Sequence, residues 1–191
     1  MMTSDNEQFE LQFLDGSQER CVNREARDFC LAMIRQTYAI DYHAQWHADL
    51  DSLLQTGDGN WYAEASRGAF CVVYNASGNM IATGGLHGFS RKPGTVARLG
   101  PRYDQHAAVC QLVRVYLAPC MRGKGLGTRI VTRLEETALK LGYQISYLHA
   151  DALAASTLRF WEHCGYREFG RFSYDANGRV DTSVDFDKQL C

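Results

Sequence analysis

The chain has 191 residues, of which 46% are hydrophobic and 22% are charged, and its 20 Lys and Arg nearly balance its 22 Asp and Glu, for a formal charge of −2. This composition is typical of a globular protein and excludes a largely disordered chain. The charge balance argues against a main partner made of nucleic acid, because neutralising a phosphate backbone needs clustered positive charge. The length favours one domain over residues 1–191 with a sizeable core.

The cysteines and the N-terminal residues indicate the cellular compartment in which the protein is expected. The seven cysteines form no Cys-x-x-Cys pair, so they encode neither a zinc ribbon nor a thioredoxin-type site. The polar N-terminus lacks the apolar core of a secretory signal, and no apolar run approaches the roughly 18 residues of a membrane span. We therefore expect a cytoplasmic protein with no membrane partner, in which most cysteines pack as small buried hydrophobes.

The first third of the chain predicts one strand and two helices. Alternating apolar residues predict a strand over 9–13, which ends at the Asp15-Gly16 turn. Apolar residues at helical spacing then predict a helix capped by Asn23. A second stretch of helical spacing over 42–54 predicts another helix, which the glycines at 57 and 59 end.

A hairpin and a basic segment are expected next. Residues 69–74 and 80–86 are apolar runs joined by a polar turn, which is typical of a β-hairpin. Residues 87–106 are rich in glycine and proline and hold four basic residues, Arg91, Lys92, Arg98 and Arg102. This composition predicts a loop, which is either a solvated surface excursion or a flap over an anionic ligand.

The second half of the chain alternates strands and helices. The predicted elements are a strand over 107–117, an amphipathic helix over 125–141, a strand over 145–149, a helix over 154–164 and a terminal hairpin of strands over 169–174 and 180–186. Gly142 is expected to cap the first of these helices and Gly165 to stop the second. Interspersed strands and helices of this kind indicate an α/β domain.

The segment 115–128, VYLAPCMRGKGLGT, carries the clearest chemical signal. A predicted strand runs into a loop with glycines at 123, 125 and 127, and the loop opens a helix. Glycines let the backbone approach a ligand closely, and a helix start presents free N–H groups at the positive end of its dipole. Arg122 and Lys124 add positive charge. The segment therefore predicts an anion site suited to a pyrophosphate, against the alternative of a glycine-rich turn without a ligand.

Two common phosphate loops are excluded by spacing. A Walker A loop needs Gly-x4-Gly-Lys-[Ser/Thr], which does not occur in this chain. The dinucleotide motif Gly-x-Gly-x-x-Gly fails because its last position falls on Thr128 or Ile130. The spacing Arg-x-x-Gly-x-Gly, which begins at Arg122, remains.

With this loop the chain resembles the GNAT superfamily of acyl-CoA-dependent N-acyltransferases. The match is VRVYLAPCMRGKGLGTRIV at 113–131, and SYLHADALAASTLRFWEHCGY at 146–166 resembles the late strand and helix of the family. The resemblance implies an α/β fold with a mixed, mostly antiparallel twisted sheet of about six to seven strands and about four flanking helices. Two central strands of that fold splay apart around acetyl-CoA.

The resemblance also implies a cofactor, acetyl-CoA, which serves as co-substrate. Its pyrophosphate would lie on the loop formed by Arg122, Gly123, Lys124, Gly125, Leu126, Gly127 and Thr128. Its pantetheine arm would pair with Val115 and Leu117, one of which would donate an amide N–H to the thioester oxygen. The acetyl group would pass directly to a primary amine of a small molecule or peptide, and homodimers are frequent in the family.

Two positions depart from the pattern that is common in the family. Gln111 stands where Glu is frequent, and an amide cannot accept a proton as a base does. Trp161 stands where Tyr often acts as the acid, and an indole N–H is a donor without useful acidity, so a core aromatic is the alternative.

Substitute catalytic residues are His149 and Tyr116. His149, with Asp151 nearby, titrates in the required range, although a structural strand histidine is the alternative. Tyr116 lies on the strand beside the expected thioester position, although alternation could turn it into the core. Cys164 is expected to be a packed residue at a helix end, because direct transfer needs no nucleophile. His43 and His47 make two metal ligands without a third, so no metal is expected and this region is read as a wall of the acceptor pocket.

Two alternatives to an enzyme stay open. Gln111 and Trp161 are compatible with a non-catalytic acyl-CoA-binding regulatory module. The basic residues over 91–102 would be the nucleic-acid contact of a different protein class, which the net charge of −2 disfavours.

Overall fold

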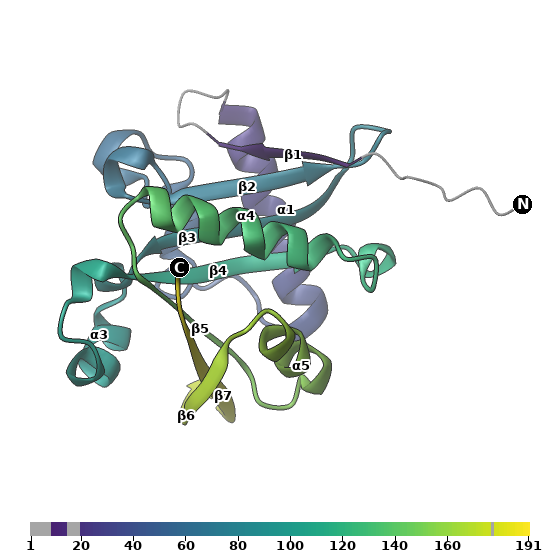
Figure 1. The fold of residues 1–191 in the computed structure, drawn as a ribbon. Helices are drawn as coiled ribbons and strands as arrows, with labels where there is room; N and C mark the ends of the chain where they lie inside the picture. The colour runs from purple at the N-terminus through teal and green to yellow at the C-terminus, as the bar shows by residue number, and fades with distance from the viewer. Residues whose placement is uncertain (1–8, 15–19, 177) are drawn as a thin grey trace, which may run out of the picture. The chain divides into compact units, whose positions relative to one another are not determined.

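The computed structural model describes residues 9–14, 20–176 and 178–191 (Figure 1). These residues form seven strands and five α-helices, and four of the five strand pairings given below are antiparallel, which confirms the expected mixed α/β fold. Across the described part of the chain, no helix has the length and apolar character that a membrane crossing requires.

The chain folds as two compact units that interleave along the sequence. The first unit comprises residues 1–87 and 114–134, and the second comprises residues 88–113 and 135–191. Strand β4 (Val109–Leu117) and helix α4 (Leu126–Lys140) each contribute residues to both units.

The strands of the first unit confirm the expected first strand and hairpin. They are β1 (Glu10–Phe13), β2 (Ala69–Tyr74) and β3 (Met80–Gly88), and they pair antiparallel in the order β1-β2-β3 (Figure 1). The β2–β3 turn is held by Asn75, whose Oδ1 accepts the N–H groups of residues 77 and 79 at 3.0 and 2.9 Å. The expected end of β1 at Asp15-Gly16 lies outside the described residues.

The helices of the first unit differ from the prediction at their ends. Helix α1 (Arg20–Tyr38) begins before Asn23, so Asn23 is not its cap. Asn23 is instead buried inside the helix, and its Nδ2 donates to the carbonyl of Leu53 at 2.9 Å. Helix α2 (Ala48–Ser52) is much shorter than the expected 42–54, because the side chain of His47 accepts the N–H of His43 and holds a turn there.

Helix α4 packs onto the sheet of the first unit through a glycine. An added Cβ at Gly84 of β3 would lie 2.6 Å from Cγ2 of Ile130 and 3.0 Å from Cδ1 of Leu134. These two side chains and Leu126 are buried, as the amphipathic pattern predicts. A larger residue at position 84 would therefore push the helix from the strand.

The basic segment of the second unit is a helix where a loop was expected. Residues 93–99 form α3 (Pro93–Leu99), whose first residue is proline, and short 3-10 turns flank it on both sides. Proline suits the first helical turn, where its missing N–H costs nothing. Phe89, Leu99 and Tyr103 are buried in a cluster with Val109 and Tyr147, so this segment belongs to the core of its unit.

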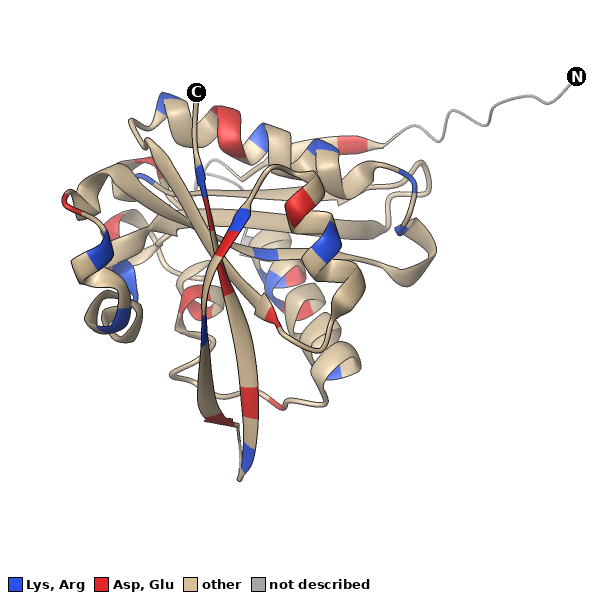
Figure 2. Cartoon of the chain, turned by 60° about the horizontal axis from the view of Figure 1, so that its bottom comes forward, with Lys and Arg blue, Asp and Glu red and all other residues tan. Residues whose placement is uncertain are grey.

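The second unit contains the remaining strands in the order β4-β5-β7-β6. They are the start of β4, β5 (Ile145–Asp151), β6 (Arg167–Ala176) and β7 (Arg179–Gln189), which confirms the predicted strand and terminal hairpin. Strand β5 pairs antiparallel with β7 along its whole length. Acidic and basic residues are interspersed along β6 and β7 (Figure 2), in keeping with the balanced net charge.

The pairing of β4 with β5 is short. It is parallel and joins Val109–Gln111 to Ile145–Tyr147, although both strands continue beyond these residues. Helix α5 (Ala155–His163) follows β5, and Gly165, with a φ of 87°, lies just after it as expected. Gly142, with a φ of 82°, likewise caps α4, where the N–H of Tyr143 bonds the carbonyl of Ala138 at 3.0 Å.

The cysteines are all free thiols, and the expectation for their packing is only partly correct. Cys30, Cys71 and Cys110 are buried, and Cys164 is half-buried. The other three are exposed, at positions 21, 120 and 191. Most of the cysteines are therefore not core residues.

Candidate functional site

The glycine-rich loop of the first unit joins β4 to α4. A 3-10 turn over Pro119–Met121 follows the strand, and the N–H of Ala118 anchors the strand end to the carbonyl of Ile81 at 2.8 Å. The N–H of Arg129 donates to the carbonyl of Gly125 at 3.1 Å. The amides of residues 126–128 therefore belong to the first turn of α4. First-turn amides have no intrahelical acceptor and point out of the helix end.

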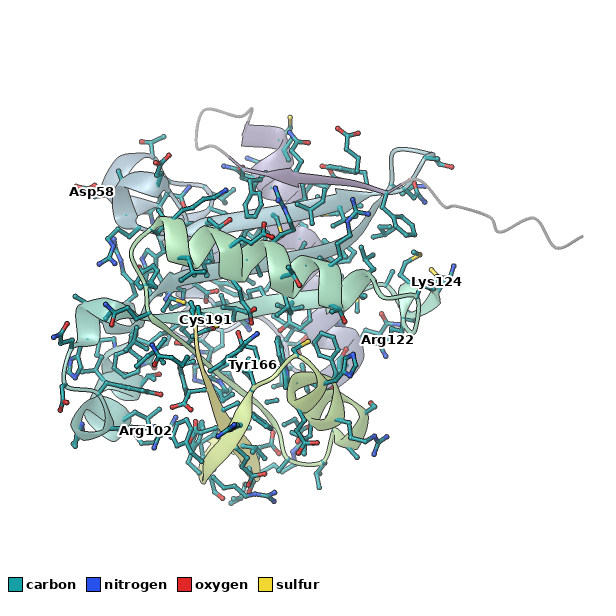
Figure 3. All side chains as sticks on the ribbon, in the orientation of Figure 1. Asp58, Arg102, Arg122, Lys124, Tyr166 and Cys191 are labelled. Carbon is teal, nitrogen blue, oxygen red and sulfur yellow. The ribbon has the colours of Figure 1, made fainter. Side chains whose placement is uncertain are left out.

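The charge around this helix start favours an anion. Arg122 and Lys124 are exposed on the loop (Figure 3), and the first turn of α4 holds no acidic residue. The positive end of the helix dipole lies at the same point. A phosphate group is the ligand that such an arrangement stabilises best.

Two glycines of the loop need their residue type for backbone reasons. Gly123 and Gly125 have φ values of 76° and 79°, a region that side chains other than glycine rarely adopt. An added Cβ at either residue would have no atom within 4 Å, so the loop surface beside them is open. The loop thus combines two left-handed glycines, open space beside them, the first-turn amides of α4 and two exposed cations.

Strand β4 carries a strained residue in its interior that the sequence did not predict. Arg114 has a φ of 57°, although it lies within a strand and is not glycine. Thr83 donates its hydroxyl to the carbonyl of Arg114 at 2.9 Å, which helps to fix this backbone. Strain of this kind persists only where surrounding contacts determine the conformation.

The side chain of Arg114 forms a buried ion pair with Asp49 of α2. Its Nε and Nη2 donate to the two carboxylate oxygens at 2.8 and 2.7 Å, and Nη2 also donates to the carbonyl of Trp46 at 3.0 Å. Tyr62 donates its hydroxyl to the same carboxylate at 2.7 Å. Burial opposes the charge on Arg114, but the carboxylate of Asp49 outweighs it and raises the pKa of Arg114. Asp49 falls among the apolar positions of the helix predicted over 42–54, which could have indicated a buried carboxylate but not the arginine that pairs with it.

Tyr116 lies two residues beyond Arg114 and is half-buried. Burial raises the pKa of Tyr116, and the neighbouring Arg114 opposes that rise. The net direction is upward, so the phenol keeps its proton at neutral pH and can act as an O–H donor.

The second unit places His149 beside a polar cluster. His149 is exposed on β5, and its Nδ1 lies 3.2 Å from the hydroxyl of Tyr147. That hydroxyl donates to Asp185 of β7 at 2.7 Å. Asp151, the expected neighbour of His149, instead accepts the N–H of Leu153 at 2.9 Å.

Arg98 of α3 completes this cluster. It binds both carboxylate oxygens of Asp185, and its Nη2 donates to the hydroxyl of Tyr147 at 2.9 Å. Its guanidinium carbon lies 3.6 Å from the ring centroid of Phe172. Arg102 similarly pairs with Asp187 at 2.8 Å. Arg98 and Arg102 of the basic segment are therefore both paired with carboxylates of β7 in the second unit.

Gln111 and Trp161, the two departures from the family pattern, are both buried. Among the described residues, Oε1 of Gln111 has no hydrogen-bond partner. Trp161 packs edge-on against Phe160 and Tyr166, which agrees with the core reading. Cys164 is half-buried at the end of α5, and its carbonyl accepts Nζ of Lys188 at 2.9 Å.

The histidines before α2 are packed together. His47 is buried, and the ring of His43 stacks on Trp46 with centroids 4.6 Å apart. Within the described part of the chain, no group of three or more His, Cys, Asp or Glu residues is arranged to hold a metal ion.

Comparison with known proteins places the chain in a family. The model of the acetyltransferase (GNAT) family matches residues 31–166, and the chain belongs to this family. The protein is accordingly an acyltransferase enzyme. An Escherichia coli K12 protein described as uncharacterized N-acetyltransferase YjgM is 24% identical over 142 residues, which cover 74% of this chain and 72% of that protein.

Solved structures share the fold. An acetyltransferase of the GNAT family from Staphylococcus aureus Mu50 superposes with a TM-score of 0.67 at 17% identity, covering 95% of this chain and 100% of that one. The yncA protein of Salmonella typhimurium, described as a putative acetyltransferase with its cofactor acetyl-CoA, superposes with a TM-score of 0.64 at 18% identity. The match covers 96% of this chain and 94% of that one. The expected GNAT-like fold is thus confirmed.

Proposed function

We propose that this enzyme transfers an acetyl group from acetyl-CoA to a primary amine of a small molecule or peptide by direct attack. The observation that carries the proposal is the loop over 122–128, where open left-handed glycines, helix-start amides and two exposed cations coincide. The yncA structure, which contains acetyl-CoA as its cofactor, supports the choice of donor. The spermidine N-acetyltransferase SpeG of Vibrio cholerae, a structural neighbour with a TM-score of 0.65, supports an amine acceptor.

The first unit would hold the donor. The amides of residues 123–128, with Arg122 and Lys124, would bind the pyrophosphate. Val115 and Leu117 would pair with the pantetheine arm, and an amide N–H of one of them would stabilise the oxyanion that develops at the thioester. Acetyl-CoA supplies an activated acetyl thioester when bound.

The chemistry needs a proton acceptor because an ordinary amine with a pKa of about 10.4 is almost wholly protonated at neutral pH. We assign that role to His149, because imidazole is the side chain whose unperturbed pKa lies closest to neutral and it can accept a proton from an amine. We assign to Tyr116 the role of O–H donor to the departing thiolate, since its raised pKa keeps its proton in place. Gln111 cannot serve as the base because an amide does not accept a proton.

Thiol release from acetyl-CoA, measured over a panel of polyamines, amino acids and peptides with free amines, tests the proposal. We expect at least one acceptor to give acetyl-CoA-dependent thiol release and an acetylated product by mass spectrometry. Absence of any heat of acetyl-CoA binding in calorimetry would refute the donor assignment.

The second candidate is a non-catalytic acyl-CoA-binding module, which the buried Gln111 favours. That candidate predicts acetyl-CoA binding in calorimetry without turnover of any amine. A single good acceptor would therefore exclude it.

We further propose that residues 1–191 act as one domain, because β4 and α4 each contribute to both units. A single cooperative unfolding transition would support this view, and two separate transitions would refute it. The free cysteines support a reducing compartment, so the proposed location is the cytoplasm. We also propose that the protein forms a homodimer, because homodimers are frequent in the GNAT family. Sedimentation velocity measures the oligomeric state.

A further inference from the structure

Among the residues that the structure describes, three polar groups of the second unit lie close to the hydroxyl of Tyr147. Oδ1 of Asp185 lies 2.7 Å away, Nη2 of Arg98 lies 2.9 Å away and Nδ1 of His149 lies 3.2 Å away. Tyr147 and Asp185 are buried. His149 and Asp185 are directly opposed in the β5–β7 register, so the cluster is built on paired strands.

The location of each proton in this cluster follows from the hydrogen-bond donors and acceptors that each side chain has. A phenol has one proton to give, a carboxylate only accepts and a guanidinium only donates. Asp185 is bound by Arg98 through two bonds and is therefore ionised, so the 2.7 Å contact between its oxygen and the phenol oxygen needs the proton of the phenol. Burial and Asp185 also raise the pKa of Tyr147, which keeps that proton on the phenol.

The contact with His149 then has one consistent direction. The phenol oxygen has given its proton to Asp185, and it accepts from Arg98. It can therefore bond to Nδ1 of His149 only as an acceptor, which requires a hydrogen on Nδ1. A neutral imidazole carries one hydrogen, so Nε2 is its basic nitrogen.

We propose that Tyr147, held by Asp185 and Arg98, is a positioning residue that fixes the proton of neutral His149 on Nδ1 and makes Nε2 the nitrogen that accepts a proton. The catalytic consequence rests on the proposed function, because it requires His149 to be the base. The tautomer itself does not depend on that function. A histidine free in water favours the opposite tautomer, so the cluster reverses an intrinsic preference.

Nitrogen-15 NMR of the full-length protein tests the proposal. Long-range proton–nitrogen spectra at a pH where His149 is neutral distinguish a protonated ring nitrogen from an unprotonated one, and His149→Gln assigns the signal among the six histidines. We expect Nδ1 to be protonated and Nε2 to be unprotonated. A wild-type His149 with its proton on Nε2 would overturn the proposal, whatever any variant does.

Two other histidines provide internal controls in the same spectrum. Nε2 of His106 lies 3.0 Å from the carbonyl of Gly100, which only accepts, so His106 should carry its proton on Nε2. Nδ1 of His47 accepts the backbone N–H of His43 at 2.9 Å, so His47 should also carry its proton on Nε2. His149 is expected to differ from both.

The variant Tyr147→Phe removes the acceptor oxygen and keeps the ring. We expect the neutral tautomer of His149 to move toward Nε2–H, and retention of Nδ1–H would overturn the role of Tyr147. We also expect kcat to fall about tenfold or more, part of the roughly 10²–10⁴-fold that a positioned general base supplies, with KM for acetyl-CoA unchanged.

The kinetic and NMR results separate the two proposals. If His149 shows Nδ1–H in the wild type and loses it in Tyr147→Phe, the positioning of the proton is supported. If His149→Gln nevertheless turns over at the wild-type rate, the assignment of His149 as the base is wrong while the tautomer stands.

Discussion

The guanidinium of Arg114 binds the carboxylate of Asp49 through two bonds of 2.8 and 2.7 Å, across 65 residues of sequence. The carboxylate is fully buried and the guanidinium is 13% exposed. The pair joins α2 to the part of β4 that would face the pantetheine arm in the proposed function. The need of the buried Asp49 carboxylate for a cation therefore also fixes the shape of β4 beside the proposed thioester position.

Arg114→Met should be strongly destabilising, because it leaves the carboxylate of Asp49 buried without its cation. We expect a loss of about 3–5 kcal/mol in the free energy of unfolding, measured by urea denaturation. The matched control is Arg27→Met, which breaks the Arg27–Asp51 pair at 2.8 Å, where both side chains are partly exposed. That variant should cost about 1 kcal/mol or less. An equal loss of unfolding free energy in the two variants would contradict the larger contribution that we expect from the buried pair.

Gly125→Glu should weaken acetyl-CoA binding on the order of 100-fold, because it places a carboxylate at the anion site of the helix start. Calorimetry measures the change. Gly78→Glu is the control, since Gly78 has a φ of 76°, close to the 79° of Gly125, and an added Cβ there also meets no atom within 4 Å. The control should share the backbone strain and keep its affinity. Equal loss of affinity in both variants would count against the loop as the binding site.

His149→Gln should lower kcat by about 10²–10⁴-fold while leaving the dissociation constant of acetyl-CoA unchanged, because the imidazole is proposed to accept the proton of the amine. Steady-state kinetics with the best acceptor of the amine panel gives kcat, and calorimetry gives the dissociation constant. His163→Gln, at an exposed position at the end of α5, is the matched control and should retain full activity. Wild-type turnover in His149→Gln would remove His149 from the mechanism.

Stability should fall at alkaline pH in part because of Cys30. Burial raises the pKa of the Cys30 thiol to about 12, and its contact with Thr83 lowers it by less. Above a pH of about 8.5 the thiol of the unfolded chain loses its proton while the folded thiol keeps it, so stability present below that pH is lost as pH rises toward 12. The expected slope is about 1.4 kcal/mol per pH unit for this thiol.

Urea denaturation of Cys30→Ala between pH 8 and about 11 measures this contribution. The variant should lose a constant amount of stability from lost packing and should show a shallower pH dependence than the wild type. Cys120→Ala, at an exposed position, should leave the slope unchanged. An identical slope in wild type and Cys30→Ala would show that this thiol does not titrate as argued.

Local sequence patterns predicted the features that depend on near neighbours. The β2–β3 hairpin, the amphipathic face of α4 and the glycines at 123 and 125 follow from periodicity, turn chemistry and backbone preference, all of which act over a few residues. The GNAT-like fold followed from the motif around Arg122, and the structure confirms it.

The polar clusters could not be predicted in the same way. Arg98 and Asp185 lie 87 residues apart, and no local pattern reports which carboxylate a distant arginine reaches. Helix α3 was missed because its proline and glycine indicate a loop, whereas Phe89 and Leu99 are buried in the core of the second unit and hold it in place. The early start of α1 was missed because Asn23 resembles a cap, whereas its amide serves the carbonyl of Leu53.

The interleaving of the two units has a consequence for synthesis on the ribosome. The first unit takes its last residues from α4, up to position 134, and the second takes its first residues from position 88 onward. A nascent chain that has reached residue 113 therefore holds an incomplete first unit together with the beginning of the second. The first unit is complete only once residue 134 has been synthesised, so until then its unpaired strand edges are open to pairing with other chains.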